Sequence, residues 1–110
     1  MNALERQRLI DTLQSVGCLA CRKRGFTGMP SDMHHPLTGG RRIDDDVFYP
    51  LCEYHHRNVQ KGAYTLEMMR LTYGPSLACE PRKFREEFGT DTELLVERDR
   101  LLQLYRKMAP

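Results

Sequence analysis

Four residues with the spacing of a zinc site lie in two short motifs, Cys18-x-x-Cys21 and Cys52-x-x-His55. Zinc binds four soft or borderline ligands in a tetrahedron, and two ligands separated by two residues can hold one ion from a tight turn. The spacing therefore predicts a structural zinc site made of these four side chains. The alternative is that the cysteines are small buried side chains and that His55 lies on the surface.

All four histidines of the chain fall in two adjacent pairs, His34-His35 and His55-His56. Neighbouring side chains on a helix point about 100° apart, so one histidine of the second pair can bind zinc while the other faces a different site. We expect His55 to bind the zinc because two-residue spacers are typical of such sites. The reverse assignment, with His56 as the zinc ligand, stays open, as does a plain surface role for His34 and His35.

Three of these histidines together could hydrolyse a phosphodiester. His34 and His56 could hold one divalent ion with open positions, and the ion would stabilise the charge that develops on the phosphate and the leaving oxygen. His35 could take a proton from the attacking water, because an imidazole titrates near neutral pH. Four basic side chains that are close by in the sequence could bind flanking phosphates: Arg41, Arg42, Arg57 and Lys61. Each of them could equally be a solvated surface charge.

The chain has 110 residues, which favours one domain over residues 1–110, and its composition is 40% hydrophobic and 29% charged, as in folded proteins. No apolar run of about 18 residues could span a membrane. Residues 1–14 are too polar and too acidic for a secretory signal, so we expect a cytoplasmic protein. The formal net charge of +2 does not by itself indicate a nucleic-acid partner, but the local density of basic residues allows one.

The elements around the motifs follow from hydrophobic spacing and from glycine and proline positions. A helix is expected over about residues 3–16, where Leu9, Leu13 and Val16 recur at helical spacing. One strand should end near His34 and His35, and a second should cover residues 47–51.

The segment between these strands, residues 36–46, should form the turn, because it contains Gly39-Gly40. After the second strand, a helix is expected from Glu53 toward Lys61, with Gly62 at its end.

A helical part is expected over about residues 65–108. One helix should run from Thr65 to Tyr73, and a second should start at Pro81 and end at Gly89. Thr90-x-x-Glu93 has the pattern of a capping box and predicts the start of a last helix. Cys79 stands apart from the two motifs, so we expect a half-buried free thiol there.

The segments that carry these motifs resemble a known family. The patterns are G-C-L-A-C at 17–21, M-H-H-P at 33–36, Y-P-L-C-E-Y-H-H-R at 49–57 and R-K-F-R-E-E-F-G-T-D-T-E-L-L at 82–95. Their order is similar to that of the HNH endonuclease superfamily, and more narrowly to the recombination-enhancement nucleases of phages, which are described as RecA-dependent. The resemblance covers most of residues 5–96.

The resemblance implies an α+β fold with a small ββα-metal core at residues 17–61, flanked by an N-terminal helix and C-terminal helices. It implies His35 as the general base and His34 and His56 as ligands of a catalytic divalent ion such as Mg²⁺. The middle HNH position, usually Asn or His, falls on Asp45. Cys18, Cys21, Cys52 and His55 match the structural zinc ligands.

The function implied is hydrolysis of DNA phosphodiester bonds in recombination or DNA processing, in the cytoplasm of a bacterium or of a phage-infected cell. DNA is the implied partner, and a RecA–DNA filament is implied as a second one. The alternative is a zinc-binding module that binds DNA or another protein without cleaving. Asp45 and the modest net charge favour that alternative, whereas the presence of His34, His35 and His56 favours the nuclease.

Overall fold

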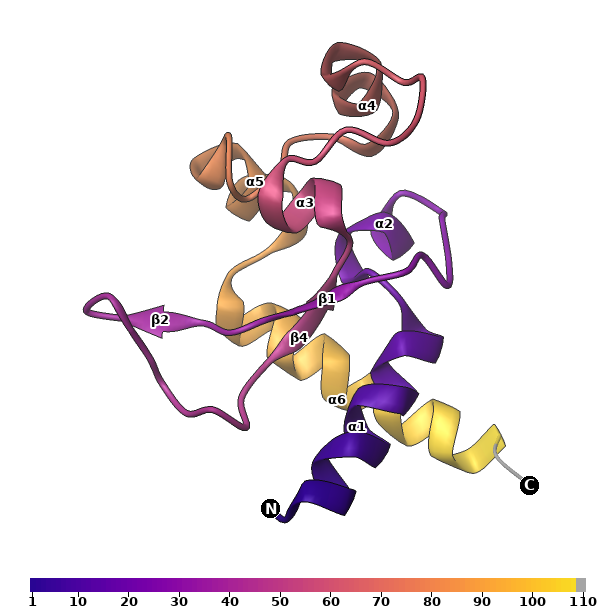
Figure 1. The fold of residues 1–110 in the computed structure, drawn as a ribbon, viewed down its shortest axis with the longest axis vertical. Coiled ribbons are helices and arrows are strands. Elements are labelled where there is room, and N and C mark those ends of the chain that lie inside the picture. The colour runs from indigo at the N-terminus through magenta and orange to yellow at the C-terminus, as the bar shows by residue number, and fades with distance from the viewer. Residues whose placement is uncertain (109–110) are drawn as a thin grey trace.

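The computed structural model describes residues 1–108, which form a mixed fold of helices and two small sheets (Figure 1). The structure thus confirms the expected α+β class. Its elements, in chain order, are α1 (Ala3–Val16), α2 (Leu19–Lys23), β1 (Asp32–His34), β2 (Leu37–Thr38), β3 (Arg41–Arg42), β4 (Tyr49–Leu51), α3 (Glu53–Arg57), α4 (Leu66–Tyr73), α5 (Pro81–Phe88) and α6 (Asp91–Met108).

The central sheet is an antiparallel pair of β1 and β4, in which His34 lies opposite Tyr49 and Asp32 lies opposite Leu51. The helix α3 follows β4 after one residue, so the chain forms a strand–strand–helix unit. Side chains two apart on a strand share a face, which places Asp32 and His34 on the same side of the sheet. This unit brings the two histidine motifs to one part of the molecule.

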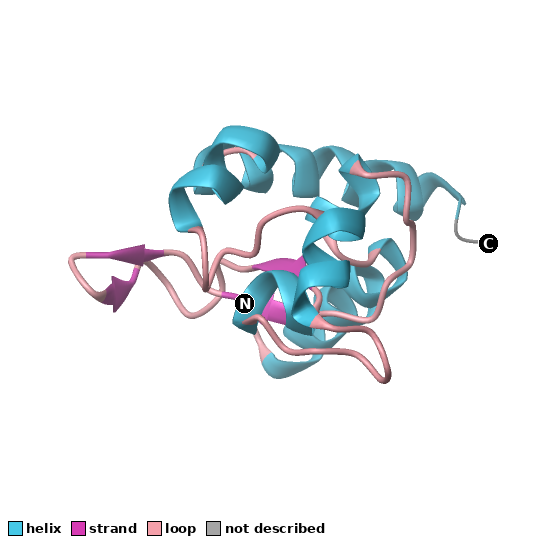
Figure 2. Cartoon of the chain, turned by 90° about the horizontal axis from the view of Figure 1, so that it is seen from above, coloured by secondary structure: helices cyan, strands magenta, loops and turns pink. Residues whose placement is uncertain are grey.

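The segment that joins β1 to β4 contains more regular structure than the turn predicted for residues 36–46. It contains its own antiparallel pair, β2 with β3, in which Leu37 lies opposite Arg42. Gly39 and Gly40 both have positive φ values, 59° and 80°, which a two-residue hairpin turn requires. This small hairpin projects away from the rest of the molecule (Figures 1 and 2).

The core lies between the central sheet and the surrounding helices. The face predicted for the first helix is confirmed, because Leu9, Leu13 and Val16 of α1 are buried. The long helix α6 packs against α1 and β4 (Figure 1). It contributes the buried Leu94, Leu101 and Leu102.

Most helix ends agree with the capping residues recognised in the sequence, and the exception is Gly62, which lies beyond the observed end of α3. Thr65 caps α4, Pro81 is the first residue of α5, and Gly89 follows its end. The predicted capping box is formed, since the Thr90 N–H donates to Glu93 Oε1 at 3.0 Å and the Glu93 N–H donates to Thr90 Oγ1 at 3.2 Å. None of the helices in the described part of the chain is long and apolar enough to cross a membrane.

The structure corrects three local predictions and adds one helix that was not predicted. The helix expected to reach Lys61 ends at Arg57, because Asn58 adopts a left-handed conformation and its N–H caps the preceding carbonyls. The strand expected over 47–51 starts at Tyr49. The single-turn helix α2 was not predicted, and Cys79 is exposed and not half-buried.

Candidate functional site

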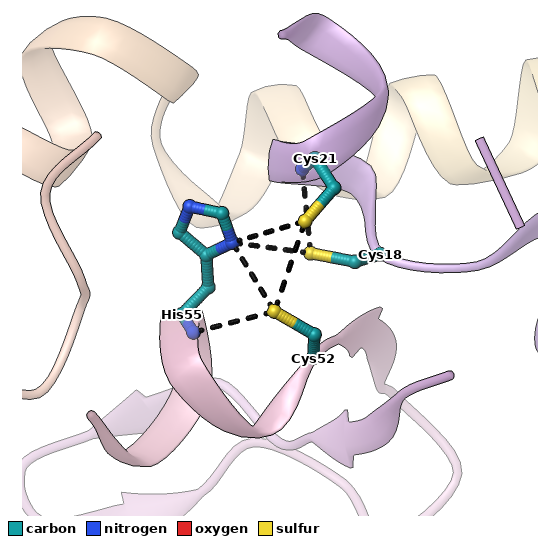
Figure 3. A group of neighbouring side chains, drawn as sticks. All are labelled: Cys18, Cys21, Cys52 and His55. Atoms are coloured by element: carbon teal, nitrogen blue, oxygen red, sulfur yellow. Dashed lines mark hydrogen bonds between the residues drawn. The ribbon is translucent and has the colours of Figure 1, made fainter. Parts of the chain in front are cut away.

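A buried cluster of three cysteines and one histidine joins the first and second cysteine motifs (Figure 3). Its members, all buried, come from α2 and α3 and the residues just before them: Cys18, Cys21, Cys52 and His55. Their ligand atoms lie within 4.8 Å of one another. The cluster could therefore hold a metal ion, as the spacing predicted.

The distances within the cluster fit a tetrahedral ion. Zn–S bonds of about 2.3 Å and Zn–N bonds of about 2.0–2.1 Å place two sulfurs about 3.8 Å apart, and a sulfur and a nitrogen about 3.6 Å apart. The Cys21 and Cys52 sulfurs are 3.7 Å apart. His55 Nδ1 lies 3.5, 3.4 and 3.3 Å from the sulfurs of Cys18, Cys21 and Cys52.

The local structure of both motifs explains why the sulfurs converge. Cys18 caps the start of α2 and accepts a hydrogen bond from the Cys21 N–H, while Cys52 caps the start of α3 and accepts one from the His55 N–H. Each motif thus folds as a turn entering a helix, with both of its ligands on the same side. The other ring nitrogen of His55, Nε2, donates to the Tyr73 carbonyl at 2.8 Å, which fixes the ring with Nδ1 toward the sulfurs.

The electrostatics of the cluster also suit a cation. Burial opposes a charge on His55, yet hydrogen bonds to the Cys18 and Cys52 sulfurs raise the pKa of His55 to about 9. Hydrogen bonds to Cys18 and Cys21 hold the pKa of the Cys52 thiol well below its ordinary value. A divalent ion bound here would take the place of the proton on His55 Nδ1, because metal binding requires a neutral imidazole and deprotonated thiols.

A second group of histidines lies where β1 and α3 meet. The rings of His34 and His56 are in edge contact, with centroids 5.1 Å apart, and the Tyr49 ring packs on His34 at the same centroid distance. The His34 and His56 side chains are 15% and 24% exposed, so this group borders solvent. Burial, followed by the nearby His56, lowers the pKa of His34 to about 4, which keeps its imidazole neutral and able to bind a metal.

Adjacent His55 and His56 do face different sites, as expected for neighbours on a helix. His55 is buried against the sulfurs, whereas His56 Nδ1 lies 3.2 Å from Asp32 Oδ2. Within residues 1–108, only the cluster of three cysteines and His55 brings three or more His, Cys, Asp or Glu ligand atoms close enough together to hold a metal ion. The structure thus brings His34 and His56 together as a pair.

His35 extends from the end of β1 toward the loop before β4. Its Nε2 lies 3.2 Å from the Asp45 backbone carbonyl, and its ring packs on Phe48 with centroids 5.4 Å apart. Because a carbonyl only accepts, Nε2 carries the proton and Nδ1 is the basic nitrogen of the neutral ring.

Asp45 contacts His35 through its backbone carbonyl and not through its carboxylate. Its side chain is 79% exposed and lies 3.4 Å from Arg42. The carboxylate that accepts a backbone hydrogen bond in this loop belongs to Asp44, whose Oδ1 accepts from the Asp46 N–H. The negative charge of Asp45 is therefore offset by Arg42 and directed to solvent.

The four predicted phosphate-binding residues differ in their surroundings and in the contacts that they already make. Arg41 and Arg42 lie on the projecting β2–β3 hairpin, and both are exposed. Arg57 donates to Asp32 Oδ2 at 2.9 Å and lies 3.6 Å from Glu53. Lys61 follows α3, and its backbone N–H donates to the Met69 sulfur.

Two carboxylates beside the histidines were not predicted from the sequence. Asp32 lies next to His56, and Asp91 Oδ1 lies 3.9 Å from His34 Nε2. The position of Asp32 two residues before His34 on a predicted strand was a usable signal, because such residues share a face. Asp91 gave no signal, because it reaches the site from the start of a distant helix.

A strand–strand–helix unit beside a buried Cys₃His cluster defines a small α+β protein with a candidate metal site. The family model for "recombination enhancement, RecA-dependent nuclease" matches residues 2–103, so the chain belongs to this nuclease family. No curated protein matches the chain. Family membership confirms the narrower resemblance seen in the sequence motifs, the one to the recombination-enhancement nucleases.

Proposed function

We propose that this protein is a metal-dependent endonuclease of the HNH class that hydrolyses DNA phosphodiester bonds during recombination, with a RecA–DNA filament as its partner. The nuclease family supports the substrate class and the partner. The observation that carries the proposal is the pairing of His34 with His56 at the junction of β1 and α3, with His35 next to His34 in the sequence. We also propose that residues 1–110 act as one nuclease domain.

His35 is the general base in this proposal. The Asp45 carbonyl holds Nε2–H, which leaves Nδ1 free to accept a proton from the attacking water. Packing on Phe48 fixes the plane of the ring. Because only one tautomer satisfies the carbonyl, the base is oriented before substrate binds.

His34 and His56 hold the catalytic divalent ion, Mg²⁺ or another, and Cys18, Cys21, Cys52 and His55 hold a structural zinc. The bound divalent ion would supply stabilisation of negative charge on the phosphate and the leaving oxygen. His34 suits this role because its imidazole stays neutral, and His56 suits it because one ring nitrogen remains after its contact with Asp32. These four residues would, with zinc bound, tie the start of α2 to the start of α3 and so fix the helix that carries His56.

The proposal is tested by cleavage of plasmid and single-stranded DNA with Mg²⁺ or Mn²⁺, with and without RecA filaments, for the wild type and His56→Ala. We expect divalent-dependent cleavage by the wild type and a loss of at least about 100-fold in the variant, because a metal ligand is removed. Zinc content should be unchanged. A zinc-loaded wild type that never cleaves but binds DNA would replace the proposal with a non-cleaving DNA-binding module.

DNA binding should depend on the projecting hairpin. We expect Arg41→Ala to weaken binding to all DNA sequences alike and to reduce the slope of log affinity against log salt by about 1, as for one lost phosphate contact. The matched control is Arg82→Ala, an arginine on α5 whose side chain is 92% exposed. Equal affinities and salt slopes for the wild type and Arg41→Ala would remove this residue from the interface.

A further inference from the structure

Both histidines proposed to bind the catalytic ion face a carboxylate that the function above does not use. His56 Nδ1 lies 3.2 Å from Asp32 Oδ2, and His34 Nε2 lies 3.9 Å from Asp91 Oδ1. The two carboxylates come from different parts of the chain, the first residue of β1 and the first residue of α6. The same chemical pairing therefore occurs twice at one site.

Each carboxylate is itself held by an arginine. Asp32 Oδ2 accepts from Arg57 Nε at 2.9 Å. Asp91 Oδ1 lies 2.8 Å from a guanidinium nitrogen of Arg85. These ion pairs hold the carboxylates in place, where each can accept a hydrogen bond from an imidazole.

Asp91 has a further anchor in the central sheet. The Tyr49 hydroxyl donates to Asp91 Oδ1 at 2.7 Å, and the Tyr49 ring packs on His34. Tyr49 is buried, and it also accepts a hydrogen bond from Arg85 at 3.1 Å. Tyr49 thus links the start of α6 to His34, because its hydroxyl binds Asp91 and its ring packs on His34.

We propose that Asp32 and Asp91 are positioning residues that orient His56 and His34 toward one shared divalent ion. A histidine that binds a metal through one nitrogen usually donates its other N–H to a carboxylate, a carbonyl or a water, which fixes the tautomer and makes the ligand more basic. With Asp32 at Nδ1 of His56, Nε2 is the metal-binding nitrogen. With Asp91 at Nε2 of His34, Nδ1 has that role.

The inference rests on the proposed function, and it adds a role for the C-terminal helices. Arg85 and Asp91 belong to α5 and α6, which lie outside the strand–strand–helix unit. On this view, these helices do more than cover the core, because they orient one of the ion's two histidines. The 3.9 Å gap between His34 and Asp91 closes to a hydrogen bond with a shift of about 1 Å.

The test measures Mn²⁺ binding to the zinc-loaded protein by electron paramagnetic resonance, for the wild type, Asp32→Asn and Asp91→Asn. Asparagine keeps the size of the side chain and removes its charge. We expect each variant to raise the Mn²⁺ dissociation constant about 10- to 100-fold, the usual cost of losing such a partner. Cleavage should be recovered at high Mn²⁺, which a general structural defect would not allow.

The matched controls are Asp99→Asn and Glu53→Gln. Asp99 is an exposed carboxylate on the same helix as Asp91, and Glu53 contacts Arg57 as Asp32 does. Both controls should bind Mn²⁺ as the wild type does. Wild-type Mn²⁺ affinity in both Asp32→Asn and Asp91→Asn would overturn the inference while leaving the nuclease intact, whereas a wild type without a Mn²⁺ site and without cleavage would overturn the proposed function as well.

Discussion

Cys52→Ser is expected to unfold most of the protein at room temperature. The change removes one of four ligands from a cluster that is buried between α2 and α3. Structural zinc contributes on the order of 10 kcal/mol of apparent folding free energy in small domains, which is comparable with the whole stability of a chain of this size. The measurement is zinc content by elemental analysis together with helical content and thermal unfolding by circular dichroism.

Serine is chosen because it separates metal binding from helix capping. Cys52 caps α3 by accepting a hydrogen bond from the His55 N–H, and a serine hydroxyl can accept the same bond. Loss of structure in Cys52→Ser therefore reports on the ion and not on the cap.

The matched control is Cys79→Ser, because Cys79 is an exposed cysteine that lies outside the cluster. It should keep the zinc and the melting temperature of the wild type. A Cys52→Ser protein that is fully folded and cooperative without zinc would show that the cluster does not depend on a metal.

His35→Ala is expected to reduce DNA cleavage about 100- to 10,000-fold while leaving zinc content and Mn²⁺ affinity unchanged. This range is typical for the loss of a general base. His35 Nε2 is held by the Asp45 carbonyl and neither ring nitrogen contacts the cysteine cluster, so its removal should spare the fold. The measurement is single-turnover cleavage of plasmid DNA at saturating Mn²⁺.

Two comparisons make the His35 result specific. Adding imidazole to His35→Ala should restore part of the rate, because a free base can enter the vacated space. Thr38→Ala, on the neighbouring β2 strand, should cleave at the wild-type rate. If His35→Ala cleaves as fast as the wild type, another group must accept the proton.

The ligand set of the buried cluster could be predicted from the sequence because it depends on local geometry. A two-residue spacer places both ligands of a motif on one turn, and soft ligand types restrict the choice of ion. The spacing alone did not decide whether His55 or His56 joins the three cysteines. Burial decided it, since α3 directs His55 to the sulfurs and His56 toward Asp32.

Several helix boundaries, above all helix starts, could be predicted from short-range rules. The capping box at Thr90 and Glu93 and the proline at position 81 act within one turn, so their effect does not depend on the rest of the fold. The end of α3 was not predicted, because Asn58 was not recognised as a left-handed cap. Its side chain accepts a hydrogen bond from Ser76, a partner that only folding brings close.

The amino-acid sequence alone was enough to single out the side chains of the candidate site: three cysteines and His55 that could hold a metal, and the three further histidines to which we assign the proposed second ion and the base. The surroundings of those histidines, in contrast, depend on contacts that form only in the folded chain. Asp91, Tyr49 and Arg85 reach His34 from α6, β4 and α5, and the backbone of Asp45 reaches His35. The physical reason is that spacing constrains side chains within a turn or a strand, whereas contacts between distant segments depend on how the helices pack around the sheet.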